Sequence, residues 1–196
     1  MRNIIFFLII LFSLQSWTKA DDISDFEIDG YSVGDSALNF ITKEFIKSEI
    51  NIHSFYKDNK YFEVTFDSKD GVYENTSLTF KNDDDEYIIY QLAGSISHKN
   101  INQCLSQKKN IVNELSKMFL NANKVDAGKR NYAADSSGKS KTYIEYFWLS
   151  EGGFVEVGCY DITKELAEKN NWLKTSLNVG IVTKEFSDFL MNEQYN

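Results

Sequence analysis

Proline, histidine and arginine are almost missing from this chain of 196 residues, and cysteine is rare. There is no proline, so the turns must be built from glycine, asparagine, aspartate and serine. The two histidines, His53 and His98, lie far apart, and neither has a second ligand at the spacing of a metal site. The two cysteines do not form a Cys-x-x-Cys pair, which argues against catalytic redox chemistry. The sequence therefore predicts no metal centre and no cofactor.

Positive charge is also in short supply. The chain has 21 basic residues against 29 acidic ones, which gives a formal net charge of −8 at pH 7. Phosphate backbones and anionic lipid surfaces bind proteins through clustered lysine and arginine. We therefore expect no nucleic acid partner for this acidic protein, and we interpret its charge as a source of solubility.

The longest hydrophobic run is short and lies at the N-terminus. It covers Ile4 to Phe12, follows a basic start at Arg2, and leads to a small residue, Ala20, before an acidic segment. This pattern is typical of a secretory signal peptide, and the run is well below the roughly 20 residues that span a bilayer. We predict a signal peptide at 1–20 that is cleaved after Ala20; the alternative is an uncleaved anchor that leaves the protein tethered to the membrane. Residues 21–196 are then expected to form a single domain, periplasmic or secreted, with no stable membrane insertion after signal cleavage.

Hydrophobic periodicity predicts both helices and strands. The strongest helix signal lies at 100–121, where an apolar stripe recurs at helical spacing. A second helix is expected at 36–50, and the alternative is a break near Thr42. Alternating segments bounded by turn signals predict strands that come mainly in hairpins. The segment 121–141 loses all periodicity and is expected to be the longest loop. We infer an α+β fold with a mainly antiparallel sheet of about five strands and helices packed on one face.

The two cysteines are expected to form a disulfide. Cys104 lies at the edge of the apolar stripe of the predicted long helix, and Cys159 shares a strand face with Val155 and Val157. Both thiols therefore point toward the core between helix and sheet, and an oxidising compartment favours their oxidation. The alternative is two small buried hydrophobic residues that do not meet. A bridge that closes a loop of about 55 residues contributes roughly 4 kcal/mol in the chain-entropy model.

The tetrapeptide GDSA, Gly34 to Ala37, raises the question of a catalytic serine. It resembles the first block of the Gly-Asp-Ser-Leu esterase and lipase family, in which the serine is the nucleophile and an Asp-x-x-His motif near the C-terminus supplies the base. Here only Gly34, Asp35 and Ser36 match, and no histidine follows His98. A serine without a base is a weak nucleophile. We therefore interpret Asp35 and Ser36 as a helix cap and predict no catalytic residue.

A longer resemblance begins just upstream of this tetrapeptide. The segment Phe26 to Leu38, FEIDGYSVGDSAL, is similar to the start of a set of small exported proteins from AT-rich marine bacteria, which share an F-x-I-x-G-x-S-x-G-D-S pattern. The CYD tripeptide at Cys159 to Asp161 is also similar to that set. The resemblance implies export and a recurring small domain, and it implies no activity.

Aromatic side chains are the remaining functional signal. In the segment YIEYFW they occur on both strand faces, and Tyr146 and Trp148 share one of them. If helices cover only one face of the sheet, Tyr143, Tyr146 and Trp148 are candidates for a ligand surface; the alternative is that they fill the core. We predict a non-enzymatic binding or interaction module of the cell envelope, whose partner is another envelope protein or a small ligand. The alternative function is an envelope hydrolase with a site of scattered Asp, Glu and Tyr or with Ser36.

Overall fold

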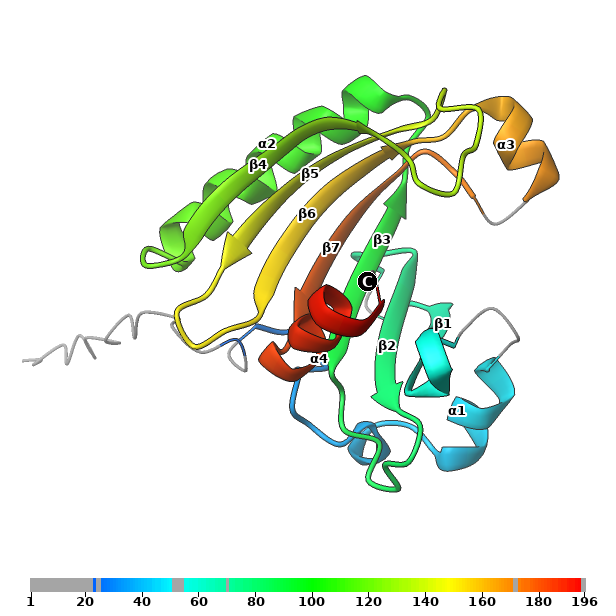
Figure 1. Ribbon diagram of the computed structural model, residues 1–196, viewed down its shortest axis with the longest axis vertical. Helices are drawn as coiled ribbons and strands as arrows, with labels where there is room; N and C mark the ends of the chain where they lie inside the picture. The colour runs from blue at the N-terminus through cyan, green and yellow to red at the C-terminus, as the bar shows by residue number, and fades with distance from the viewer. Residues whose placement is uncertain (1–22, 24–25, 51–54, 70, 171–172, 195–196) are drawn as a thin grey trace, which may run out of the picture.

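One antiparallel sheet organises the chain (Figure 1). The computed structural model describes residues 23, 26–50, 55–69, 71–170 and 173–194. Neighbouring strands are antiparallel throughout, in the order β1-β2-β3-β7-β6-β5-β4. The predicted α+β class with an antiparallel sheet is confirmed, and the sheet has seven strands where about five were expected. These are β1 (Tyr61–Asp67), β2 (Asn75–Lys81), β3 (Gln91–Ser97), β4 (Asn123–Asn131), β5 (Lys141–Trp148), β6 (Phe154–Asp161) and β7 (Ser176–Val182).

Each α-helix begins after a side chain that caps it. The hydroxyl or amide oxygen of the capping residue accepts a hydrogen bond from a backbone N–H of the first turn, which satisfies a donor that the helix itself cannot pair. The caps are Thr42, Asn100, Thr163 and Thr183. The helical elements are η2 (Ala37–Asn39), α1 (Lys43–Glu49), η3 (Lys57–Asn59), α2 (Ile101–Met118), α3 (Lys164–Lys169), α4 (Lys184–Phe189) and the π-helical turn η4 (Leu190–Gln194). Across the described ranges, no helix has both the length and the hydrophobicity needed to cross a bilayer.

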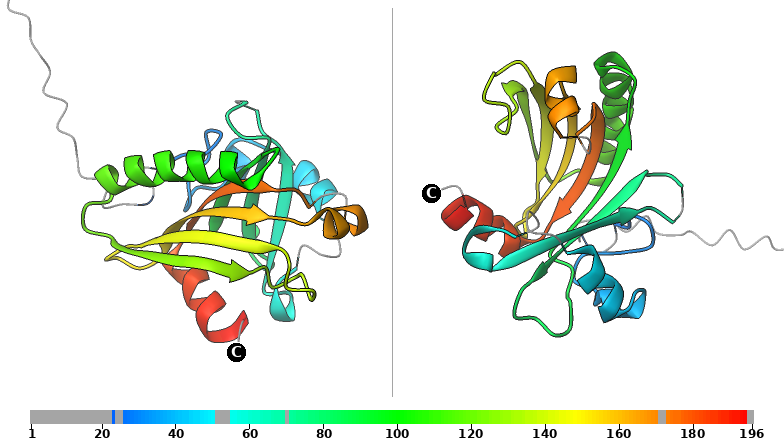
Figure 2. Two further views of the ribbon diagram at one scale, coloured as in Figure 1. Left: turned by 90° about the horizontal axis from the view of Figure 1, so that it is seen from above. Right: turned by 90° about the vertical axis from the view of Figure 1, so that its right-hand side faces the viewer.

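The two faces of the sheet carry different helices (Figure 2). Strand alternation sends Val155, Val157 and Cys159 of β6 toward α2, and we call that side the α2 face. The opposite side, the α4 face, receives Phe186 and Phe189 of α4. These two rings form a small hydrophobic cluster at one end of the α4 face with Tyr61, Phe154 and Val182. Helices were expected on one face, and α4 adds a short helix on the other.

The predicted disulfide joins α2 to β6. Cys104 and Cys159 are bonded, their Cα atoms lie 6.0 Å apart, and both side chains are fully buried. The bridge sits in the main core, between α2 and the centre of the sheet, where the apolar stripe of α2 meets β6 and β7. A disulfide in the core is consistent with folding in an oxidising, extracytoplasmic compartment. The predicted signal peptide at 1–20 lies outside the described residues and stays a prediction.

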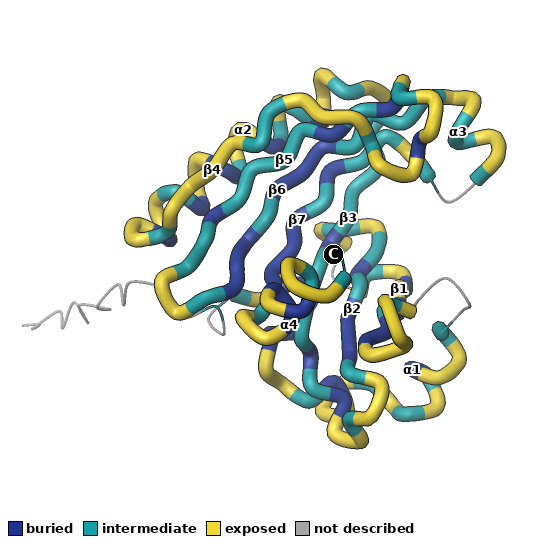
Figure 3. Tube along the Cα trace, viewed as in Figure 1, coloured by how far each residue is buried: buried dark blue, intermediate teal, exposed yellow. Residues whose placement is uncertain are grey.

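The segment 121–141, predicted as a loop, contains the edge strand β4. Its side chains are mostly exposed, because β4 is the edge strand of the sheet and pairs only with β5 among the described strands (Figure 3). An edge strand of this kind has no apolar alternation, so the sequence signal for a strand is missing. The ladder also shifts between Asp126 and Lys129, which interrupts the period of two.

The helix predicted at 36–50 is divided in two. Thr42 has an extended backbone with φ −85° and ψ 157°, so the short turn η2 ends before it and α1 starts after it. The hydroxyl of Thr42 accepts a hydrogen bond from the N–H of Phe45 at 3.2 Å. Threonine competes for helical backbone groups in this way and therefore favours helix starts over helix interiors.

Candidate functional site

The α4 face of β5, β6 and β7 brings together the most unusual polar groups of the chain. In the antiparallel register, Tyr146 of β5 lies opposite Glu156 of β6, and Glu156 lies opposite Gly180 of β7. One step along, Gly158 lies opposite Asn178. Residues that face each other across such ladders point to the same side of the sheet, about 5 Å apart at Cβ. Glu156 therefore stands between an aromatic ring and a glycine, with the amide of Asn178 as its diagonal neighbour.

Glu156 carries a carboxyl group without a partner. The side chain is half-buried, and among the residues that the structure describes none forms a hydrogen bond or ion pair with it. Removal from water raises the pKa of Glu156 to about 7, and no neighbouring charge contributes to the shift. A partly desolvated acid normally has a donor or a cation beside it, because the charged form is otherwise costly.

Gly180 leaves the room that Glu156 occupies. A Cβ atom at position 180 would lie 3.3 Å from Cγ of Glu156 and 3.6 Å from its Oε1, and 3.7 Å from Cβ of Ala93. The carboxyl group thus lies across β7 instead of standing away from the sheet. Gly158 leaves room for other neighbours, because a Cβ atom there would lie 3.2 Å from side-chain atoms of both Ile144 and Tyr160.

Three aromatic rings lie beside Glu156 on the same face. The ring centroids of Tyr146 and Trp148 are 5.9 Å apart, and Phe154 lies 5.5 Å from Tyr146 and 4.8 Å from Trp148. Tyr146 and Trp148 are half-buried, whereas Phe154 is buried under α4. Tyr143, the third residue of the predicted ligand surface, lies on the α2 face, because it is an odd number of positions from the other two. It packs against the core there, so the structure brings together only Tyr146 and Trp148.

Asn178 has a buried oxygen that lacks a donor. Its Oδ1 has no hydrogen-bond partner within the described part of the chain, and the same holds for Oγ1 of Thr79 on the same face. Buried polar atoms in native proteins are nearly all paired, so each exception asks for an explanation. The oxygen of Asn178 and the carboxyl group of Glu156 are both acceptors, and both lie on the strand pair β6–β7.

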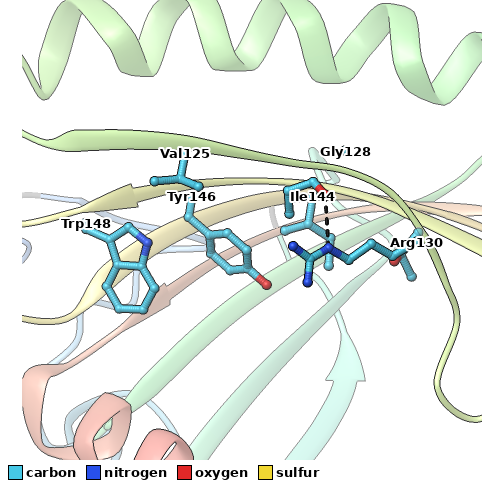
Figure 4. Close-up of a pocket in the computed structure, with 8 residues that line it drawn as sticks. Val125, Gly128, Arg130, Ile144, Tyr146 and Trp148 are labelled. Carbon is cyan, nitrogen blue, oxygen red and sulfur yellow. Dashed lines mark hydrogen bonds between the residues drawn. The ribbon is translucent and has the colours of Figure 1, made fainter.

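A hollow of about 210 Å³ lies on the α4 face next to these residues (Figure 4). Tyr146 and Trp148 form one end, and the side chain of Arg130 extends from the other end toward the hydroxyl of Tyr146. Its Nε donates a 3.0 Å hydrogen bond to the carbonyl of Ala127. The lining comes from β4 and β5 only, and consists of Val125, Ala127, Gly128, Arg130, Thr142, Ile144, Tyr146 and Trp148. The hollow therefore extends the surface around Glu156 toward the edge of the sheet.

A second acid with a raised pKa, Glu63, lies far from Glu156. Burial raises the pKa of Glu63 to about 7, although hydroxyl hydrogen bonds from Thr65 and Tyr56 stabilise its charged form. Three strands separate β1 from β6, which places Glu63 roughly 19 Å from Glu156 along the sheet. The two carboxyl groups are not a pair of the kind that carries out acid–base catalysis.

Ser36 is placed as a structural residue. It is the N-cap of η2, where its hydroxyl oxygen accepts a 3.3 Å hydrogen bond from the N–H of Leu38 and its hydroxyl group donates to the carbonyl of Glu86. Asp35 precedes the cap, and its backbone carbonyl accepts from the N–H of Ile89. Of the two histidines only His98 is described, and it follows the far end of β3.

The described residues contain no group of three histidine, cysteine, aspartate or glutamate side chains that could hold a metal ion. Glu156 is the functional candidate that sequence reasoning missed. Alternation in the segment VEVGC already places Glu156 on one face of its strand and the apolar residues Val155 and Val157 on the other face. The register with Tyr146 and Gly180, which gives the acid its neighbours, is visible only in the structure.

Comparison with models of protein families, with curated proteins and with solved structures gives no significant match, so the residues of the α4 face carry the functional argument alone.

Proposed function

We propose that this protein is a non-enzymatic binding module that holds a small polar ligand on its α4 face. The observation that carries the proposal is the carboxyl group of Glu156, which is half-buried and has no partner among the described residues. Gly180 gives it space, and Tyr146 supplies an aromatic wall. Ligand sites typically combine apolar and aromatic surface with a few placed polar groups.

Energetics support a ligand at this position. An acid that is removed from water and left unpaired destabilises the fold, whereas the same acid gains a strong interaction when a ligand donates to it. Proteins accept local costs of this kind mainly at functional sites. The unpaired oxygen of Asn178 adds a second acceptor that the same ligand would satisfy.

An NMR titration with a fragment library of amines, sugars and short peptides tests the proposal. We expect binding fragments to shift the backbone amides around Tyr146, Glu156 and Asn178, and these shifts to disappear in Glu156→Gln. The matched control is Glu168→Gln, because Glu168 is an exposed acid on α3 that forms no ion pair with any described residue and lies outside the α4 face. Fragments that bind only elsewhere, or that bind Glu156→Gln unchanged, contradict the proposal.

An envelope hydrolase is the second candidate, and one observation favours it. A carboxyl group with a pKa near 7, such as that of Glu156, suits a general acid or base. The alternative requires a nucleophile or second acid beside it, whereas Glu63 lies across the sheet and Ser36 is engaged in its cap. We expect Glu156→Gln to hydrolyse p-nitrophenyl acetate and p-nitrophenyl glycosides no more slowly than the wild type does. Hydrolysis by the wild type that is lost in Glu156→Gln would favour the enzyme.

We also propose that the protein is periplasmic or secreted. The supporting observations are the buried Cys104–Cys159 bridge and the signal-like sequence at 1–20. Intact mass and N-terminal sequencing of the exported protein should place the first residue at Asp21. An N-terminus at Met1 in the mature protein contradicts this proposal.

A further inference from the structure

We propose that the ligand of the α4 face is an organic cation, in which a protonated primary amine binds Glu156 and an apolar or aromatic body lies against Tyr146 and Trp148. This inference rests on the proposed function, because it names the ligand class of the same surface. The binding surface consists of the unpaired carboxyl group of Glu156, the unpaired Oδ1 of Asn178 and the two rings.

Charge is the first argument. The acid Glu145, on the α2 face of the next strand, is held by Lys108 at 2.9 Å and by Lys124 at 2.8 Å. Glu185 on α4 is held by Lys81 at 2.6 Å. Within the described residues Glu156 has no such cation, although it is also removed from water. A ligand that brings its own positive charge supplies to Glu156 what Lys108 and Lys124 supply to the half-buried Glu145.

Hydrogen-bond polarity is the second argument. On the α4 face of β6 and β7, the side-chain atoms without a partner among the described residues are acceptors, namely the carboxylate oxygens of Glu156 and the Oδ1 of Asn178. The two residues are diagonal neighbours on the β6–β7 ladder, which puts their Cβ atoms within about 7 Å of each other. One ammonium group between them donates to both, because it carries three N–H bonds. An anionic ligand would meet repulsion here.

The aromatic rings are the third argument. Tyr146 lies directly opposite Glu156, and Trp148 is the next residue of β5 on the same face. Ring faces attract cations, most strongly that of tryptophan, and they also cover the apolar part of a ligand. Uncharged polyols also stack on aromatic rings, but they leave the charge of Glu156 without a counterion. The combination of acid and rings therefore favours an amine over a sugar.

Arg130 sets the limit of the cation site. It lies at the β4 side of the hollow, opposite Thr142, whereas Tyr146 is four residues further along β5. No ion pair joins Arg130 to Glu156, and its charge does not contribute to the pKa shift of Glu156. The Arg130 side chain extends into the hollow toward the hydroxyl of Tyr146 (Figure 4), so the amine is expected on the other side of that ring, beside Glu156 on β6.

Calorimetric and NMR titrations of the purified protein with tyramine, tyrosol and glucose test the inference. Tyramine and tyrosol share the phenol ring and the chain, and differ in an ammonium against a hydroxyl group. We expect tyramine to bind about tenfold more tightly than tyrosol, since a charge-assisted hydrogen bond is about twice as strong as a neutral one. Glu156→Gln should remove this difference, and Asn178→Ala should reduce it, whereas Glu168→Gln should leave it unchanged.

The outcomes separate the inference from the proposed function. Equal binding of tyramine and tyrosol at the amides around Glu156, or binding of glucose in preference to both, overturns the cation while the binding face stands. Failure of tyramine to shift any amide of the α4 face also overturns the cation, and the fragment titration then decides on the function. A dispersed NMR spectrum of Glu156→Gln would show that the variant is folded, so that a loss of ligand binding in it is not caused by unfolding.

Discussion

Glu156 and Tyr146 lie directly opposite each other in the β5–β6 ladder, on the face of the sheet that α4 only partly covers. The pairing puts an acid without a described partner next to a half-buried phenol ring and opposite a glycine. Such an acid weakens the folded state in the absence of a ligand. Stability measurements can therefore detect it before any ligand is known.

The contribution of Glu156 to stability should depend on pH. Its folded pKa of about 7 lies above the ordinary value of 4.5, so between these values the folded state binds more protons than the unfolded state. Stability must then fall as the pH rises through this window. We expect Glu156→Gln to have the stability of the wild type near pH 4 and to exceed it by at most about 3 kcal/mol at pH 8, less in practice because the group is partly hydrated.

Urea unfolding of the wild type and of Glu156→Gln from pH 4 to pH 8 measures this difference. Glu168→Gln is the control and should show a difference near zero at every pH. A gain for Glu156→Gln that is equally large at pH 4 would mean that the carboxyl group keeps its ordinary pKa in the fold.

Ser36 should matter for stability and not for catalysis. Ser36→Ala removes the cap of η2 and the hydrogen bond to the carbonyl of Glu86, and we expect a loss of about 1–2 kcal/mol. Thermal unfolding measures the loss, and p-nitrophenyl acetate measures any esterase activity. A variant that keeps full stability but loses a wild-type esterase activity would restore the serine as a nucleophile.

Sequence patterns located the core of this fold better than its candidate functional site. The alternation of Val155, Val157 and Cys159, together with the stripe of α2, was enough to predict the buried disulfide. These signals are strong because one face of each element is apolar. By contrast, β4 is exposed on nearly all its residues, and an edge strand of that kind leaves no period to detect.

The candidate site was only half visible for a related reason. Alternation placed Tyr146 and Trp148 on one face, and the structure puts Tyr143 on the other. Whether those rings lie under a helix depends on where α4 packs, and amphipathic spacing in α4 does not reveal that. The unpaired state of Glu156 depends on strand register and on Gly180, which are long-range properties of the sheet.

The disulfide should contribute a large part of the stability of the domain. Cys104 and Cys159 are separated by 55 residues, so the bridge restricts the unfolded chain strongly. We expect the double variant Cys104→Ser, Cys159→Ser to lose about 2–4 kcal/mol in urea unfolding. Dithiothreitol should lower the stability of the wild type and leave the double variant unchanged. A wild type that is insensitive to dithiothreitol after unfolding and refolding would contradict this role.

Gly153 lies in the tight turn of the β5–β6 hairpin, which carries Tyr146 and Glu156. We expect this position to tolerate no side chain. Gly153 has φ +78°, and a Cβ atom there would lie 2.4 Å from the carbonyl oxygen of Val182 and 3.0 Å from the N–H nitrogen of Lys184. Gly128, in β4, has φ +67° but nothing within 4 Å of a Cβ atom. Both alanine variants therefore incur the cost of a left-handed backbone, about 1–2 kcal/mol, and only Gly153→Ala adds a clash with backbone atoms that cannot rotate away.

We expect Gly153→Ala to be the less stable variant by at least about 1 kcal/mol in urea unfolding. It should also shift the NMR signals of Tyr146 and Glu156, whereas Gly128→Ala should leave the signal of Glu156 in place. Equal losses for the two variants would show that backbone conformation alone, and not the contact with β7, limits this turn.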